Sequence, residues 1–173
     1  MVQQTSKPMP GHNNHDVPHR CAHCRILIIQ ARFYNDIADE LFEGAIAEVT
    51  AQGATYETVV VPGALEIPQV LASAIAAGGF EAVEHGYHGA VALGCVIRGE
   101  TSHYDVVVGN ANHWLMDVAL RHGIAVGNGI LTVDTKEQAH ARSRGGRAGK
   151  GADAVRACFA LIDAARKFQE QGV

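Results

Sequence analysis

The segment from residue 97 to residue 105 combines residue types that could bind an anion and move protons. An apolar run ends here, Gly99 permits a tight turn, and Thr101 and Ser102 are residue types that begin helices. The first N–H groups of a helix have no partner within it, so the segment predicts a site for an anion such as phosphate. His103 falls in the first helical turn, where it could give and take protons at neutral pH. A helix cap beside a surface histidine is the alternative interpretation.

A second cluster of cations lies between Arg142 and Lys150, where glycines separate them. The guanidinium group donates a planar fork of hydrogen bonds that suits phosphate, and lysine supplies a mobile point charge. The spacing is not that of a P-loop, because the four-residue gap and the Gly-Lys-Ser/Thr ending are absent. The run therefore predicts either a phosphate contact or a solvated basic turn, and it is also compatible with RNA contact.

Phe33 and Glu66 are two further candidates. Phe33 directly follows an apolar run and could stack on a planar ring, although core packing is the commoner use of a single phenylalanine. Glu66 stands at the start of a predicted helix, where interaction with the helix dipole would explain a carboxylate without any ligand. Neither residue identifies a site by itself.

These candidates fall at junctions between predicted strands and helices. Four apolar runs predict strands, and the segments between and after them repeat apolar residues at helical spacing. Strands are expected at residues 25–31, 58–61, 89–97 and 125–132, and helices at residues 35–52, 65–77, 103–122, 136–143 and 150–170. The alternation predicts an α/β three-layer sandwich, with a four-stranded parallel sheet and helices on both faces. Ligands of such sheets bind outside the carboxyl ends of the strands, so the candidates are expected to meet there.

The composition fits one folded domain. The chain has 173 residues, of which 47% are hydrophobic and 18% charged, as is typical of globular proteins. The formal net charge of −4 argues against a general nucleic-acid binder. No run of about 18 apolar residues and no signal-peptide pattern is present, so we expect no membrane association and a cytoplasmic protein.

Residues 1–24 are expected to form a flexible arm that precedes a domain of residues 25–173. The arm carries three prolines and four histidines without apolar periodicity. Cys21 and Cys24 have the spacing of half a zinc site, but a structural zinc site needs four ligands and a second cysteine pair is missing. We therefore favour an arm without metal. The four cysteines of the chain are too few and too unevenly placed for a disulfide scaffold.

Taken together, these segments resemble the lumazine synthase family. The resemblance spans residues 25–170 and follows the family order. The matching pieces are Arg32-Phe33, Val61–Pro68, Leu93–Asp105, Gly129–Thr132, Glu137–Ala139, Arg142 and Lys150-Gly151. It implies a flavodoxin-like sheet and the condensation of two small molecules, 5-amino-6-(D-ribitylamino)uracil and 3,4-dihydroxy-2-butanone 4-phosphate. The products would be 6,7-dimethyl-8-ribityllumazine, phosphate and water, with no cofactor and no metal.

The resemblance also implies a role for each candidate. Phe33 would stack on the ring, Glu66 would bind the ribityl chain, and His103 would transfer protons. The other substrate-binding positions are Ala64, Leu65, Cys95, Val96, Ile97 and Asn128. The phosphate-binding positions are Gly99, Glu100, Thr101, Arg142 and Lys150. Every step of the implied reaction moves protons and none needs a hydride, which fits a histidine beside a bound phosphate.

Two positions depart from the family pattern. Tyr34 follows the stacking aromatic residue where many members have asparagine, and Asn128 stands where many have a second aromatic residue. The loss of one apolar wall at Asn128 puts ring binding and turnover rate in doubt.

Family members assemble as pentamers with the site between adjacent subunits. The resemblance therefore implies a homo-oligomer in which the neighbouring subunit supplies Asn128, Arg142 and Lys150. Single pentamers, decamers and icosahedral 60-mers are all compatible with the sequence. Two other functions remain open: a flavin- or lumazine-binding protein with little catalysis, which Asn128 favours, and a structural shell or carrier protein. A nucleotide-binding module of flavodoxin type is disfavoured, because no glycine fingerprint follows the first strand.

Overall fold

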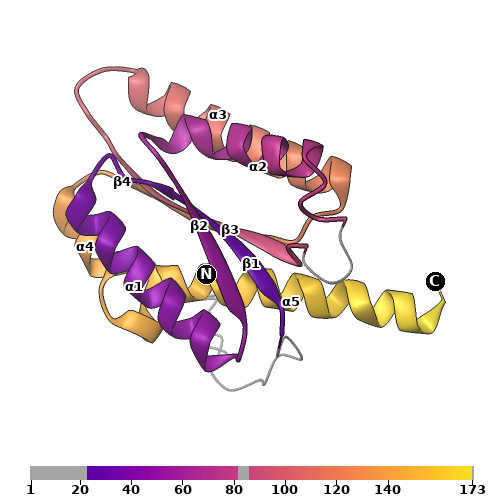
Figure 1. The fold of residues 1–173 in the computed structure, drawn as a ribbon. Coiled ribbons are helices and arrows are strands. Elements are labelled where there is room, and N and C mark those ends of the chain that lie inside the picture. The colour runs from indigo at the N-terminus through magenta and orange to yellow at the C-terminus, as the bar shows by residue number, and fades with distance from the viewer. Residues whose placement is uncertain (1–22, 82–85, 173) are drawn as a thin grey trace, which may run out of the picture.

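Four parallel strands form the central sheet of the computed structural model, which describes residues 23–81 and 86–172 (Figure 1). The strands are β1 (Arg25–Ala31), β2 (Thr55–Val61), β3 (Gly89–Ile97) and β4 (Val126–Val133). They pair in the order β2-β1-β3-β4, which is the start of the flavodoxin-like order. The predicted α/β sandwich is therefore confirmed.

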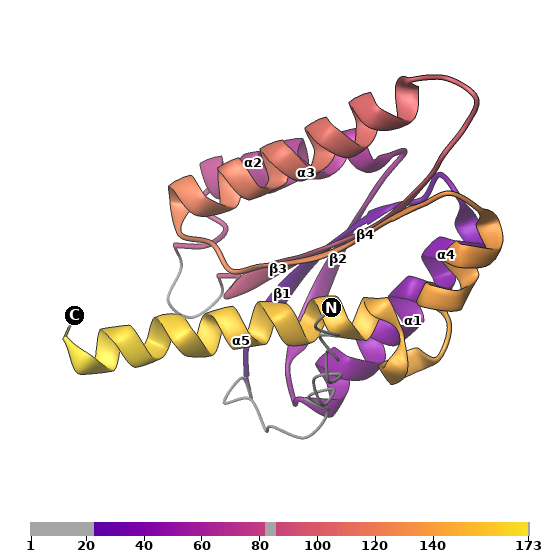
Figure 2. The ribbon, with the colours of Figure 1, turned by 180° about the vertical axis from the view of Figure 1, so that it is seen from behind.

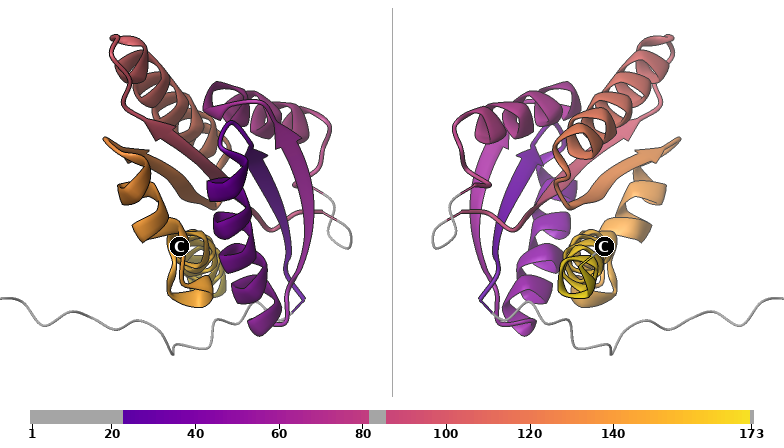
Figure 3. Two further views of the ribbon diagram at one scale, coloured as in Figure 1. Left: turned by 90° about the vertical axis from the view of Figure 1, so that its left-hand side faces the viewer. Right: turned by 90° about the vertical axis from the view of Figure 1, so that its right-hand side faces the viewer.

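Helices cover both faces of this sheet (Figures 2 and 3). They are α1 (Asn35–Ala51), α2 (Ile67–Ala76), α3 (His103–His122), α4 (Lys136–Ser143) and α5 (Lys150–Gln171), with the 3-10 turns η1 (Ala64–Glu66) and η2 (Gly146–Ala148). Helices α2 and α3 lie on one face, and α1, α4 and α5 lie on the other (Figure 2). Among the described residues, no helix has the length and apolar content needed to cross a bilayer.

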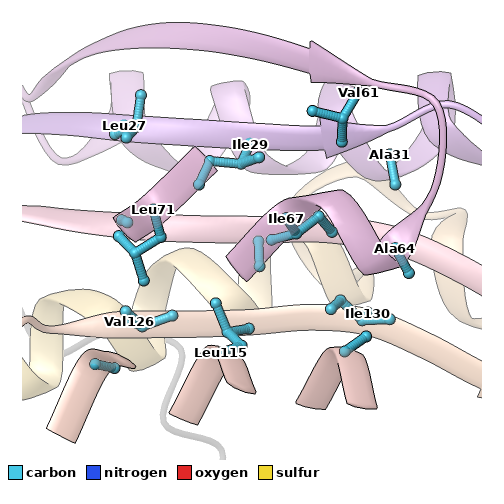
Figure 4. Packing of buried hydrophobic residues seen from close by; sticks show 14 residues of the cluster. Leu27, Ile29, Ala31, Val61, Ala64, Ile67, Leu71, Leu115, Val126 and Ile130 are labelled. Atoms are coloured by element: carbon cyan, nitrogen blue, oxygen red, sulfur yellow. The ribbon is translucent and has the colours of Figure 1, made fainter. Parts of the chain in front are cut away.

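The burial of strand β1 explains why its sequence is an unbroken apolar run. Leu27 and Ile29 pack against α2 and α3 (Figure 4), whereas Ile26 and Ile28 pack into the cluster shared with α1 and α5. All four side chains are buried. A strand with a helix layer on each side has no solvent face, so its sequence does not alternate between apolar and polar residues.

Strand β2 begins at Thr55, three residues before its predicted start. The added residues, Thr55, Tyr56 and Glu57, are exposed, because β2 lies at the edge of the sheet and pairs only with β1 in the described part of the chain. An edge strand has little apolar burial to mark it in a sequence. The helix predicted from residue 65 is similarly divided into η1 and α2, with Pro68 in the first turn of α2.

The backbone of helix α5 packs directly against the backbones of β4 and α1. A Cβ on Gly127 of β4 would lie 1.9 Å from the carbonyl oxygen of Ala154 in α5. A Cβ on Gly151 of α5 would lie 1.9 Å from the carbonyl oxygen of Leu41 in α1. No side chain fits at either place, so these two glycines fix the first turns of α5 against the sheet and α1.

Most of the predicted arm, residues 1–22, lies outside the described residues, and Cys21 with it. Cys24, which was also assigned to the arm, is fully buried among the side chains of β1, α1 and α5. The guanidinium of Arg166 donates a 3.3 Å hydrogen bond to its sulfur. Cys24 is therefore a core residue in the structure.

Candidate functional site

A cavity of about 370 Å³ opens where β1, β2 and β3 end and α3 begins. This volume is in the usual range for small-ligand pockets. Predicted site residues that line it are Phe33, Ala64, Leu65, Glu66, Cys95, Val96, Ile97, Gly99, Thr101 and His103. The remaining lining residues are Tyr34, Pro62, Gly63, Tyr104 and Val107. The cavity thus gathers segments separated by up to 74 residues in sequence, as the strand order requires.

Phe33 presents a largely free aromatic ring to this cavity. The backbone N–H of Arg32 donates to the carbonyl of Val61 (3.0 Å), which holds the chain just before Phe33 at the end of the sheet. The Phe33 side chain is 72% exposed although it is large and apolar. Its only described ring contact is edge-on to Tyr34, with centroids 5.0 Å apart. The core-packing explanation for Phe33 is therefore wrong, and its ring remains available for stacking.

Glu66 reaches the cavity from the turn η1. Its Oε2 accepts a hydrogen bond from the backbone N–H of Gly63 (2.9 Å), which fixes the carboxylate at the cavity wall. No hydrogen bond to its Oε1 is found among the described residues, so this oxygen can accept from a hydroxyl group of a ligand.

The start of α3 contributes the polar end of the cavity. Ser102 occupies the N-cap position, but its side chain makes no capping hydrogen bond. Thr101 Oγ1 accepts from the backbone N–H of His103 (3.3 Å). A Cβ on Gly99 would meet no atom within 4 Å, so packing within the chain does not require glycine there. The arrangement suits an anion that approaches the backbone between Gly99 and His103.

Arg98, which was not among the predicted site residues, supports this turn. Its guanidinium lies 4.0 Å from the ring centroid of Tyr104 and donates to Asp134 (3.0 Å) and Asp105 (3.4 Å). Asp134 directly follows β4, so Arg98 joins the end of β4 to the first turn of α3. Val107 could have been found from sequence, because it lies one helical turn after His103 and shares its face.

Cys95 lines the cavity as a protonated thiol. Burial, with a smaller contribution from the Asp36 carboxylate, raises the pKa of Cys95 to about 11. A thiol with that pKa is almost fully protonated at neutral pH and is a poor nucleophile. We therefore assign Cys95 a packing role in the cavity wall.

Four predicted site residues do not line this cavity. Glu100 is exposed in the same turn, and Asn128, Arg142 and Lys150 lie on β4, α4 and α5. The last three are the residues that the resemblance assigns to the neighbouring subunit.

Comparison with known proteins identifies the family. The profile of the 6,7-dimethyl-8-ribityllumazine synthase family matches residues 23–166. The chain belongs to this family. It is 49% identical over 144 residues to 6,7-dimethyl-8-ribityllumazine synthase 1 of Rhodopseudomonas palustris, covering 83% of this chain and 87% of the relative. It is 48% identical over 143 residues to 6,7-dimethyl-8-ribityllumazine synthase of Azorhizobium caulinodans, with the same two coverages. Every predicted site residue lies within the part that matches the lumazine synthase family.

Asn128, one of the two departures from the lumazine synthase pattern, is held by contacts within the chain. Its Nδ2 donates to Asn112 Oδ1 of α3 (2.6 Å), and its Oδ1 accepts from the backbone N–H of Ile130 (3.0 Å). Both polar atoms of the amide are thus satisfied, which fixes the side chain against α3. The contact explains how a polar residue is tolerated where many lumazine synthases carry an aromatic ring.

Arg142 differs from the lysine and arginine side chains around it, between residues 136 and 150. Four of them pair with carboxylates: Lys136 with Asp36, Arg144 with Glu40, Arg147 with Glu48, and Lys150 with Asp153. Arg142 Nη1 instead donates to the backbone carbonyl of Gln138 (2.9 Å), and no salt bridge to Arg142 occurs within residues 23–81 and 86–172. No described carboxylate neutralises its charge, which is therefore available to an anion.

Proposed function

We propose that this chain is a lumazine synthase that condenses 5-amino-6-(D-ribitylamino)uracil with 3,4-dihydroxy-2-butanone 4-phosphate. The products are 6,7-dimethyl-8-ribityllumazine, inorganic phosphate and water. The observation that carries the proposal is the cavity, which places a free aromatic ring, a fixed carboxylate and a histidine at a helix start in one space. The proposal is further supported by the family match and by relatives that bear this enzyme name.

The ribitylaminouracil occupies the apolar part of the cavity in this proposal. Its ring stacks on Phe33, and a ribityl hydroxyl donates to the free oxygen of Glu66. Backbone groups of Val96 and Ile97 meet the pyrimidine edge. Ala64, Leu65 and Cys95 complete the wall around it.

The phosphate of the second substrate binds at the start of α3. Backbone N–H groups of Gly99, Glu100 and Thr101 donate to its oxygens, and the helix dipole favours its negative charge. Arg142 and Lys150 of an adjacent subunit supply the cations. The proposed assembly is accordingly a homo-oligomer with shared sites, either a pentameric ring or the decamer or icosahedral 60-mer built from such rings, and it acts in the cytoplasm.

The chemistry then consists of proton transfers between bound groups. The amine of the uracil attacks the ketone, and the resulting carbinolamine loses water to form an imine. Elimination of phosphate then leaves an enol, which tautomerises to a ketone. Attack of the second amine on this ketone, with loss of another water, closes the ring. His103, next to the phosphate, donates and accepts the protons of these steps. Holding both substrates together removes much of the entropic barrier.

Turnover of the purified protein tests this proposal. Lumazine absorbance would be followed with both substrates and compared with a protein-free blank, because the condensation also proceeds on its own. We expect clear acceleration, and a kcat lower by on the order of 100-fold in His103→Ala with both KM values nearly unchanged, because proximity is retained while proton transfer is impaired. His122→Ala, at the exposed end of α3 remote from the cavity, is the matched control. A wild-type rate equal to the blank, together with tight riboflavin binding, would instead establish a binding protein.

A further inference from the structure

Helix α4, which carries Arg142, has little apolar anchoring of its own. It is eight residues long, and only Ala139 and Ser143 are buried. Isolated helices of this length are unstable in water, so contacts with other elements must hold α4 in place. Thr135 caps its first turn by accepting from the backbone N–H of Gln138 (3.2 Å), but this bond is within the segment itself.

The carboxylate of Glu40 on α1 holds the last turn of α4. Glu40 Oε1 accepts from Arg144 Nε (2.8 Å), and Oε2 lies 2.8 Å from His140 Nδ1. The hydroxyl of Ser143 also donates to Oε2. One side chain of α1 thus contacts three residues that are about 100 positions away in sequence.

The residues that make these contacts flank Arg142 in the sequence. His140 precedes it by two residues, and Ser143 and Arg144 follow it directly. The other end of the helix is tied to α1 as well, because Lys136 Nζ lies 2.7 Å from Asp36 Oδ2. The direction in which Arg142 leaves α4 is therefore set by α1, and at the last turn by Glu40.

Glu40 is ionised at neutral pH. Burial alone would raise its pKa, but the hydrogen bonds from Ser143, Arg144 and His140 outweigh it and lower the pKa to about 2. An ionised carboxylate only accepts hydrogen bonds, so Nδ1 of His140 carries a proton in this contact. The same charge pairs with Arg144, whereas Arg142, two residues earlier, pairs with no carboxylate in the described part of the chain.

We infer that Glu40 is a positioning residue for the phosphate site: it fixes the last turn of α4 so that the guanidinium of Arg142, which pairs with no carboxylate of the described residues, reaches the phosphate of the neighbouring subunit. This inference rests on the proposed function, since it requires Arg142 to bind phosphate. Glu40 itself lies outside the residues that line the cavity. Its effect is therefore expected on phosphate affinity and not on the proton-transfer steps.

The Glu40→Gln variant tests this role, with Glu43→Gln as the matched control. Glu43 is an exposed residue of the same helix, so its variant makes the same chemical change away from α4. We expect Glu40→Gln to raise the KM for the butanone phosphate on the order of tenfold, with kcat and the KM for the ribitylaminouracil nearly unchanged. The Ki of inorganic phosphate as an inhibitor should rise by the same factor. Equal losses for both substrates, or no change in either phosphate constant, would overturn the inference.

A double-mutant cycle separates this inference from the proposed function. If Glu40 acts through Arg142, Glu40→Gln should have no further effect on the KM for the butanone phosphate in an Arg142→Ala background. An effect that is fully retained in that background would overturn the positioning role. No effect of Arg142→Ala itself would instead refute the phosphate site on which the inference rests. Should Glu40→Gln fail to fold, Ser143→Ala removes one of the three contacts and should shift the same KM in the same direction by a smaller factor.

Discussion

Replacing Arg142 by alanine is expected to raise the KM for the butanone phosphate about 100-fold, the equivalent of about 2–3 kcal/mol for a charge-assisted hydrogen bond. The physical reason is that, among the residues the structure describes, Arg142 has no carboxylate partner whereas the neighbouring lysine and arginine side chains do, so its charge can act on an anion. The loss should appear in initial rates measured over a range of butanone phosphate concentrations. The KM for the ribitylaminouracil should change little, because that substrate carries no phosphate.

The control for this experiment is Arg121→Ala. Arg121 is an exposed residue near the end of α3 and pairs with Asp117 one turn earlier, so its loss removes a guanidinium at a distance from the cavity. Arg142→Lys is an informative intermediate, since it keeps the charge but loses the planar fork. Wild-type phosphate affinity in Arg142→Ala would show that this guanidinium does not bind the substrate.

The Glu48→Ala variant is expected to lose about 3–5 kcal/mol of unfolding free energy, the usual cost of removing one partner from a buried ion pair. Glu48 is fully buried in α1, where its carboxylate accepts from Arg147 Nε (2.9 Å) and Arg156 Nη1 (2.7 Å). Without it, the Arg156 guanidinium, itself only 12% exposed, would lose its buried carboxylate partner. Urea or thermal unfolding at neutral pH measures the effect.

Acid should remove part of this stabilisation in the wild-type protein. Burial would raise the pKa of Glu48, but hydrogen bonds from Arg147 and Gln52 and the charge of Arg156 outweigh it and lower the pKa below its ordinary value of 4.5. The stabilisation is therefore complete above about pH 4.5 and disappears as the pH falls through the lowered native pKa. Glu43→Ala, an exposed residue of the same helix, should change stability by less than about 0.5 kcal/mol. Equal stabilities of the two variants would contradict the assigned role of Glu48.

The elements that could be predicted are those whose burial produces a recognisable pattern in a short stretch of sequence. Strands β1 and β3 were placed to the residue, because both are buried on both faces and end at a sharp change of composition. The first three residues of β2 were missed, because an exposed edge strand carries polar residues like those of a loop. Helix α3 could be bounded because Thr101 and Ser102 precede it and Gly123, with φ of 64°, ends it.

The cavity was predictable for a related reason. Its residues stand at the ends of consecutive parallel strands, and such ends necessarily meet at one edge of the sheet. The contacts of Glu40 and Glu48 were not predictable in this way. They join residues about 100 positions apart and depend on how α1 packs against α4, η2 and α5. Such pairings leave no periodic pattern in the sequence from which they could be predicted.

The backbone contacts at Gly127 and Gly151 limit how this sequence can diverge over generations. The obstructing atoms are main-chain oxygens, so no repacking of side chains can make room for a larger residue at either position. A saturated codon library selected only for folded protein would keep glycine codons at both. Gly99 has open space around it, and the same selection would let its codon drift. A second selection, for growth that depends on the proposed activity, would keep glycine at all three positions. The difference between the two libraries would separate a glycine retained for phosphate binding from glycines retained for packing.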